Sequence, residues 1–234
     1  MQHVISAKDL QARPIATPGW PEIIAGLSVM ALVGYGGGSQ LYRLGLPSTS
    51  HGLVFAGLSG VAGLLGFQTA VSLRVRDVSA FGIRRTSSRW LLIAVGVGLA
   101  ALVVKMAVVL ATAQITHTIT HVQDVYAAGG SGGTASLILA TFLLAVLTPV
   151  GEEFLFRGVL TTALLRYGPL IAVGGSAVIF AVMHGVNAIL PIALLEGLLA
   201  AEIFRRSGSI WTAVMVHALY NLPSVPVMVL SAHG

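Results

Sequence analysis

Long apolar stretches with few charged side chains constrain this 234-residue chain more than any other feature. A helix needs about 20 apolar residues to cross a hydrocarbon core of roughly 30 Å, so such stretches mark membrane spans. The sequence predicts an all-α, polytopic transmembrane bundle of about seven spans, within a range of six to eight. It also predicts one transmembrane domain over residues 20–234, preceded by a cytoplasmic segment, 1–19. The marked stretches are 20–44, 52–73, 90–113, 135–165, 169–186, 191–204 and 210–230.

The amino-acid composition agrees with a membrane protein and excludes a soluble one. Only 9% of residues are charged and 56% are hydrophobic, whereas a soluble domain carries about a quarter charged residues. The net charge is +5, but the basic residues follow a membrane rule, so no nucleic-acid partner is expected. The chain has no cysteine, which excludes disulfides, a thiolate nucleophile and cysteine-ligated metals.

The placement of lysine and arginine predicts the orientation. Cytoplasmic loops carry an excess of these residues, and ten of the thirteen fall on one side if the N-terminus is cytoplasmic. Arg43 would lie outside, while Lys105 and Arg157 fall within spans. We therefore expect a cytoplasmic N-terminus and an external C-terminus. The ten are Lys8, Arg13, Arg74, Arg76, Arg84, Arg85, Arg89, Arg166, Arg205 and Arg206.

A charged motif, GEEFLFRG, interrupts the fourth predicted span at residues 151–158. An ionisable side chain within a span costs at least a few kcal/mol unless it is paired or faces a cavity, which makes each one a functional candidate. Glu153 and Arg157 are four residues apart and can pair on one helix face. Glu152 is turned about 100° from Glu153 and is left for another role. Pro149 should distort the helix just before them.

Three further polar residues, His184, His217 and Asn221, lie in later spans. At ~1.5 Å per residue from the nearest cytoplasmic turn, Glu152, His184 and His217 lie roughly 21, 22 and 12 Å deep. These depths overlap once unequal helix protrusion is allowed. We therefore expect one glutamate, two histidines and one asparagine to meet within the membrane on three helices.

The chemistry open to this set is the activation of water. A carboxylate among apolar walls can act as a general base, with a neighbouring histidine to orient the proton, and a second histidine with an asparagine amide can donate to an oxyanion. Glu152, His184 and His217 also equal the ligand set of a hydrolytic zinc site. No serine nucleophile in a G-x-S-x-G turn lies in the spans that carry these residues, and the Asp-x-Gly pattern of aspartyl membrane proteases is absent from the sequence.

The motifs Glu152-Glu153-x-x-x-Arg157, Phe180-x-x-x-His184 and His217-x-x-x-Asn221 follow one another on successive late spans. In this order they resemble the CPBP intramembrane proteases, also called the Abi or CAAX-protease family, whose eukaryotic members cleave prenylated CAAX proteins. The resemblance covers residues 135–221 well, with a catalytic core at about 135–222, and reaches weakly to 81–91.

The resemblance implies an intramembrane endopeptidase that acts on a membrane-associated protein or peptide, in or near the inner leaflet. Glu152 and His184 would activate water, and His217 and Asn221 would stabilise the oxyanion. Glu153 and Arg157 would support the site, with Phe180 packed beside it. Zinc stays open as a cofactor; the metal-free scheme is slightly favoured because His217 and Asn221 lie one turn apart. We expect the protein in a prokaryotic inner or plasma membrane.

Two other classes of function compete with the peptidase. The same glutamate and histidines could form a proton or cation path in a transporter or channel. Such a transporter would often show inverted repeats, and the sequence shows none. The chain could also be a non-proteolytic scaffold of the bacteriocin-immunity type.

Other polar residues have less specific interpretations. We expect Lys105 to pair with Glu196 or Glu202 rather than to catalyse, and Glu202 could instead pair with the arginines that follow it. His117 and His121 have the spacing of a zinc helix but lack its glutamate.

Glycines form two groups with different predicted roles. Gly57, Gly60, Gly63 and Gly66 recur at intervals of three and predict close helix packing. The four glycines within 129–133 predict a flexible external loop.

Overall fold

The computed structural model describes residues 17–116 and 123–231, and every regular element in this part of the chain is helical. The elements are α1 (Trp20–Ala31), η1 (Leu32–Gly36), α2 (Gly37–Arg43), α3 (Ser48–Leu73), η2 (Val78–Phe81), α4 (Ser88–Thr116), α5 (Asp124–Gly130), α6 (Thr134–Phe142), η3 (Leu143–Leu147), α7 (Thr148–Glu153), η4 (Phe154–Thr161), α8 (Thr162–Leu164), η5 (Leu165–Tyr167), α9 (Pro169–Met183), α10 (Leu190–Ser207), α11 (Ile210–Asn221) and α12 (Ser224–Ser231).

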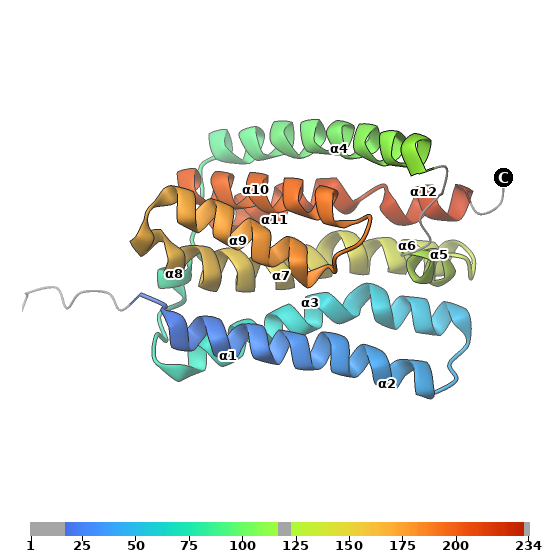
Figure 1. Cartoon of the computed structure of the whole chain (residues 1–234), viewed down its shortest axis with the longest axis horizontal. Coiled ribbons are helices and arrows are strands. Elements are labelled where there is room, and N and C mark those ends of the chain that lie inside the picture. Colours follow the sequence, from blue (N-terminus) through green and yellow to red (C-terminus); the bar gives the residue numbers. More distant parts are fainter. Residues whose placement is uncertain (1–16, 117–122, 232–234) are drawn as a thin grey trace, which may run out of the picture.

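The helices form a bundle whose central member is the run from α6 to η5 (Figure 1). On one side of this run lie α3 and then the run from α1 to α2. On the other side lie α9, α10 and α11, with α4 packed on α11 at the edge of the bundle. This arrangement confirms the predicted polytopic helical bundle and places the GEEFLFRG motif in its interior.

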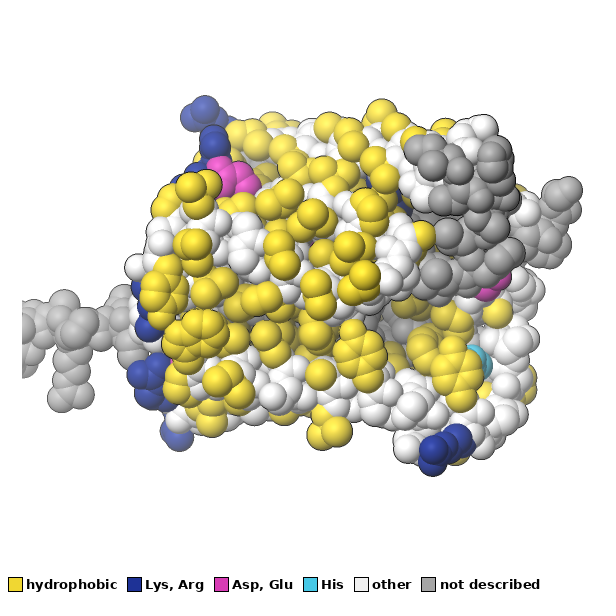
Figure 2. All heavy atoms as spheres, viewed as in Figure 1, with side chains coloured by type: hydrophobic (Ala, Val, Ile, Leu, Met, Phe, Trp, Pro, Cys, Tyr) yellow, Lys and Arg dark blue, Asp and Glu magenta, His cyan; other side chains and the backbone are white. Residues whose placement is uncertain are grey.

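Five helical runs are long and apolar enough to cross a membrane: Trp20–Arg43, Ser48–Leu73, Ser88–Thr112, Thr134–Tyr167 and Ile210–Ser231. They agree with five of the predicted spans, and the protein is an integral membrane protein. Figure 2 shows the expected broad apolar surface between the two ends of the bundle.

The two remaining predicted spans are weaker candidates. The fifth, α9, has only 15 residues, and α10 has 18 residues that include two glutamates and two arginines. These two helices form a hairpin whose tip, between Met183 and Leu190, stops short of the end that α3 and α4 reach (Figure 1). The prediction of seven full spans is therefore not confirmed.

One end of the bundle carries most of the described arginines and is called the arginine-rich end below. Figure 2 shows this clustering, with a separate dark-blue area at the opposite end. The cluster consists of Arg74, Arg76, Arg84, Arg85, Arg89, Arg166, Arg205 and Arg206.

The helix that carries the motif is distorted on both sides of Glu152. Wide π-turns precede it in η3 and follow it in η4, and Pro149 lies in the short α-helical piece between them. The predicted distortion is therefore present. Such π-turns are frequent at functional sites because they redirect side chains within a helix.

Glycines allow α3 to approach this helix closely. A Cβ atom at Gly151 would overlap the backbone of Gly60, and one at Gly63 would lie 2.5 Å from the backbone of Gly151. The predicted packing role of the α3 glycines is confirmed at these positions. The predicted loop at 129–133 is partly wrong, because Gly129 and Gly130 end helix α5 and are buried, with Gly129 against Gly52 of α3.

Candidate active site

Glu152 lies on α7 in the middle of the fourth long span, with a residue exposure of only 2%. Its Oε2 atom is buried and has no hydrogen-bond partner in the described part of the chain. Nε2 of His184 lies 3.9 Å from it, and Nε2 of His217 lies 4.0 Å from it. Both distances exceed a hydrogen bond, and contacts of this length are often bridged by a water molecule.

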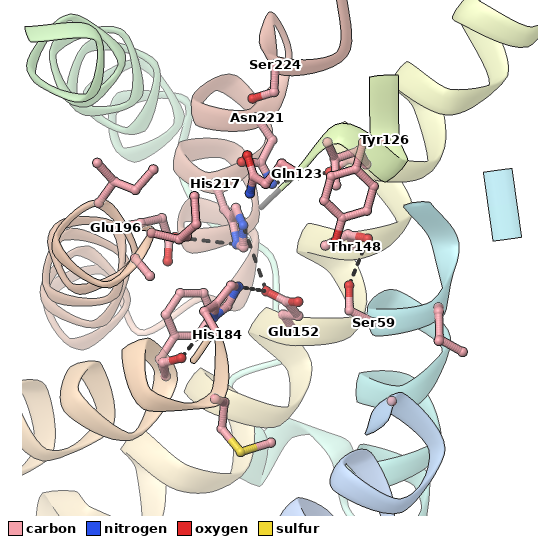
Figure 3. A pocket seen from close by; sticks show the side chains of 18 of the residues that line it. Ser59, Gln123, Tyr126, Thr148, Glu152, His184, Glu196, His217, Asn221 and Ser224 are labelled. Atoms are coloured by element: carbon pink, nitrogen blue, oxygen red, sulfur yellow. Dashed lines mark hydrogen bonds and ion pairs between the residues drawn. The ribbon is translucent and has the colours of Figure 1, made fainter. Parts of the chain in front are cut away.

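His184 directly follows the last residue of α9, Met183, at the tip of the α9–α10 hairpin. Its Nδ1 atom lies 2.9 Å from the carbonyl oxygen of Phe180, one turn earlier. The ring of Phe180 packs on the imidazole with 4.5 Å between centroids. Because the backbone contact and the packing fix the ring, Nε2 faces Glu152, as Figure 3 shows.

His217 approaches Glu152 from a third element, α11, and is buried. Its Nδ1 atom lies 2.9 Å from Oε1 of Glu153. The carboxylate of Glu153 therefore accepts a hydrogen bond from Nδ1–H. This contact fixes the imidazole with Nε2 directed toward Glu152 (Figure 3). A carboxylate that orients a histidine in this way is common at catalytic and metal sites.

Behind the histidine, Glu153, Arg157 and Glu196 form a fully buried ion network. Nε of Arg157 donates to Glu153 at 2.7 Å, which confirms the predicted pair. Nη2 of Arg157 donates to Oε1 of Glu153 and to Oε2 of Glu196, each at 3.3 Å. The ring of Phe180 lies 5.0 Å from the guanidinium carbon, so it supports both the network and His184.

Glu196 is the member of the site that the motifs did not assign. It lies on α10, 39 residues beyond Arg157, and its Oε1 atom is 3.5 Å from Nδ1 of His217. The only signal in the sequence was a carboxylate within an apolar stretch, which is costly in a membrane unless it is paired.

Asn221 ends α11 one turn after His217 and lines the same cavity. Its side-chain amide donates to the carbonyl oxygen of Leu144 at 3.3 Å. That carbonyl lies in the π-helical η3, where the backbone pattern changes. Asn221 therefore links α11 to the distorted helix and lines the cavity with the other three predicted catalytic residues.

A cavity of about 310 Å³ joins these side chains. Glu152, His184, His217 and Asn221 all line it, as do Thr148 of α7 and Ser59, Tyr126 and Ser224 from three other helices (Figure 3). This volume is many times the ~30 Å³ that one water molecule occupies in the liquid. The cavity can therefore hold water together with part of a peptide.

Lys105 also lines this cavity, but its predicted ion pair is wrong. Its ammonium group donates to the carbonyl oxygen of Tyr220 at 3.0 Å and to the hydroxyl of Ser224 at 2.9 Å. Glu202 instead pairs with Arg205 and Arg206, as its alternative interpretation predicted.

A metal-binding set is present among the described residues, but it differs from the predicted one. Ligand atoms of Glu153, Glu196 and His217 lie within 4.8 Å of one another and could hold a metal ion. Arg157 already contacts both of these carboxylates, so a positive charge is supplied there by the protein itself. The second candidate, His117 with His121, lies outside the described residues.

Comparison with known proteins bears on the same region of the chain. Residues 134–223 match the model of a family described as Rce1-like, type II CAAX prenyl endopeptidase Rce1-like. This segment is similar to the CAAX-protease family. The resemblance given by the three motifs is thereby confirmed, although the matched segment is less than half of the chain. Nothing among curated proteins or solved structures matches it.

The Rce1-like segment contains the structural centre of the site. It begins with α6 at Thr134 and ends just beyond Asn221, so it includes both glutamates of the motif and both histidines. The first three long helices lie outside the match. They nevertheless contribute Tyr35, Ser59 and Lys105 to the cavity wall.

Proposed function

We propose that this protein is an intramembrane endopeptidase that hydrolyses a peptide bond of a membrane-associated protein or peptide. One observation carries the proposal. Within the residues that the structure describes, the buried Oε2 of Glu152 has no hydrogen-bond partner, and it lies within 4.0 Å of two imidazole nitrogens at the wall of a cavity. An unpaired buried carboxylate is costly, and a bound water molecule would supply its missing hydrogen bond.

In the first step, Glu152 accepts a proton from this water as the oxygen attacks the carbonyl carbon of the substrate. The carboxylate acts as the general base of this step. His184 holds the water through Nε2, because its Nδ1 atom is already in contact with the Phe180 carbonyl. The products of this step are a tetrahedral oxyanion and a protonated Glu152.

His217 is placed to stabilise that oxyanion. Its Nε2 can donate only when both ring nitrogens are protonated, and the carboxylates of Glu153 and Glu196 stabilise the resulting cation. Asn221 supplies a second donor if its amide exchanges the Leu144 carbonyl for the substrate. Collapse of the intermediate breaks the C–N bond, and Glu152 returns its proton to the leaving amine.

Zinc is the alternative source of water activation. Glu152, His184 and His217 would hold the ion, since Nε2 of each imidazole lies within 4.0 Å of Oε2 of Glu152. Bound zinc would lower the pKa of a ligated water molecule. Glu153 would then orient His217 as a ligand, and Asn221 would remain a hydrogen-bond donor beside it.

The test is cleavage of a library of synthetic membrane peptides by purified protein, with products identified by mass spectrometry and Glu152→Gln as the inactive control. We expect discrete cuts that the control does not make. Metal analysis, chelation and re-addition of zinc separate the two mechanisms. Turnover that survives complete zinc removal supports the metal-free scheme, whereas loss and recovery with zinc supports the metal site. A wild-type protein that cuts no peptide under either condition contradicts the proposal.

A further inference from the structure

The α9–α10 hairpin does not reach across the bundle, and its tip carries His184. Both helices have their other ends at the arginine-rich end, beside Arg166 and Arg205. At 1.5 Å per residue, the 15 residues of α9 extend about 22 Å from that end, and the 29 residues of α4 extend about 44 Å. The tip therefore lies inside the membrane, beyond the midplane of a core roughly 30 Å thick.

The cavity occupies the space that the short hairpin leaves. Its walls include Tyr126 of α5 and Ser224 of α12, two helices at the end opposite the arginines (Figure 1). Phe55 of α3 and Tyr35 of η1 complete this side of the wall. Tyr35 is 58% exposed and donates a hydrogen bond to the carbonyl oxygen of Met183, next to His184. Figure 2 shows this face hollowed between the tip of α9 and the run from α1 to α2.

The arginine-rich half of the bundle is closed. Phe81, Leu155 and Phe156 are completely buried there, within a continuous apolar core. The segment that follows η2 seals the start of α11: the amide of Ile210 donates to the Gly82 carbonyl, and the hydroxyl of Ser209 donates to the Arg84 carbonyl. Among the described residues, these contacts close the arginine-rich end, so water and peptide do not reach Glu152 from that side.

We propose that the site opens to the half of the membrane opposite the arginine-rich end, and that its occupant is an extended stretch of a membrane-inserted peptide entering beside the α9–α10 tip. Since arginine collects on the cytoplasmic side, the opening faces the extracytoplasmic half. This inference rests on the proposed peptidase function for its occupant and reverses the inner-leaflet location expected from the sequence. The substrates are then membrane proteins whose susceptible bond lies in the outer half of the bilayer.

The natural absence of cysteine allows a direct test of the opening. Single cysteines replace Ser59 in the cavity wall, the exposed Ser87 at the arginine-rich end and the exposed Ser131 at the opposite end. A membrane-impermeant maleimide is applied to either face of sealed vesicles. We expect Ser59→Cys to be labelled from the same face as Ser131→Cys, and its labelling to be lost when the reagent is confined to the Ser87→Cys face. Labelling of Ser59→Cys from the Ser87→Cys face, from both faces or from neither overturns the proposal.

A second measurement tests the occupant without requiring cleavage. Ser59→Cys is combined with Glu152→Gln, and a synthetic span of about 20 leucine and alanine residues is added to the vesicles. We expect the peptide to slow labelling at Ser59→Cys and to leave labelling at Ser131→Cys unchanged. Equal rates with and without the peptide would contradict the peptide occupant. Because neither measurement depends on hydrolysis, this inference and the peptidase proposal can fail separately.

Discussion

Glu152 and Glu153 are neighbours in the chain and both are buried, yet their surroundings are opposite. Glu153 receives hydrogen bonds from Arg157 and contacts Nδ1 of His217, so both of its oxygens have partners. Glu152 faces a cavity, and no described residue forms a hydrogen bond with its buried Oε2 atom. The helix turn of about 100° between adjacent residues directs one carboxylate into the ion network and the other toward the substrate space.

The difference shows how a membrane protein can keep a reactive carboxylate in its interior. Buried charges are stable when they are paired and hydrogen-bonded. The network around Arg157 meets this requirement and holds α7, α10 and α11 together. Glu152 does not meet this requirement, so the rest of the fold offsets the free-energy cost of burying its charge. Local violations of this kind are expected at functional sites.

The largest expected effect separates the two glutamates by activity. Glu152→Gln should reduce peptide hydrolysis by about 10²–10⁴-fold, because an amide cannot take a proton from water. Its thermal unfolding temperature should stay at or above that of the wild type, since a costly unpaired charge is removed. Peptide cleavage and unfolding are measured on the same preparation. Activity within about tenfold of wild type would remove Glu152 from the role of base.

The second-largest effect is expected from a substitution that breaks the ion network around Arg157. Arg157→Met leaves Glu153 and Glu196 buried without a cation, which should lower the free energy of unfolding by about 3–5 kcal/mol. Activity should fall as well, because Arg157 no longer holds Glu153, the residue that orients His217. Denaturant titration in detergent measures the change, and Arg157→Lys is the control that keeps the charge. If Arg157→Met unfolds like wild type, the network does not stabilise the fold.

The sequence was sufficient for the parts of the site that depend on local spacing. Glu153 and Arg157 are four residues apart on one helix, so their pairing could be predicted without tertiary structure. Apolar length alone located the five long spans. The order of the three motifs indicated the resemblance to the CAAX-protease family, and the match to residues 134–223 confirms that resemblance.

Long-range contacts explain what the sequence could not give. Glu196 contacts Arg157 across 39 residues, and no motif spacing encodes that approach. Lys105 was expected to pair with a carboxylate, but it donates to the Tyr220 carbonyl near the end of α11 and to the Ser224 hydroxyl at the start of α12. Gly129 was assigned to a loop because glycine favours turns, whereas its close approach to Gly52 requires a residue without a side chain. Each outcome depends on which helix lies opposite.

A smaller effect tests whether packing holds the two glutamates in their different positions. Gly151→Ala places a Cβ against the carbonyl of Gly60 on α3 and should cost about 1–3 kcal/mol of stability through forced backbone shifts. Gly174→Ala is the matched control, since its Cβ would meet open space and alanine favours a helix. Both are compared by thermal unfolding and peptide cleavage. Equal behaviour of the two variants would contradict the close α3 contact.

The smallest effect concerns Glu196, which combines features of the other two carboxylates. Its Oε2 atom contacts Arg157, whereas its Oε1 atom has no hydrogen bond in the described part of the chain. Glu196→Gln keeps the volume and removes one of two anions beside Arg157, so we expect a loss of about 1 kcal/mol in stability and a modest loss of activity.

A double-mutant cycle with Arg157→Met separates the pair from the rest of the network. Because residues in one ion network couple, the double variant should be more stable than the two single losses, added together, would predict. Additive losses would mean that Glu196 acts without Arg157. Such a result would place Glu196 with Glu152, as a carboxylate held for the cavity, and would leave Glu153 as the one partner on which Arg157 depends.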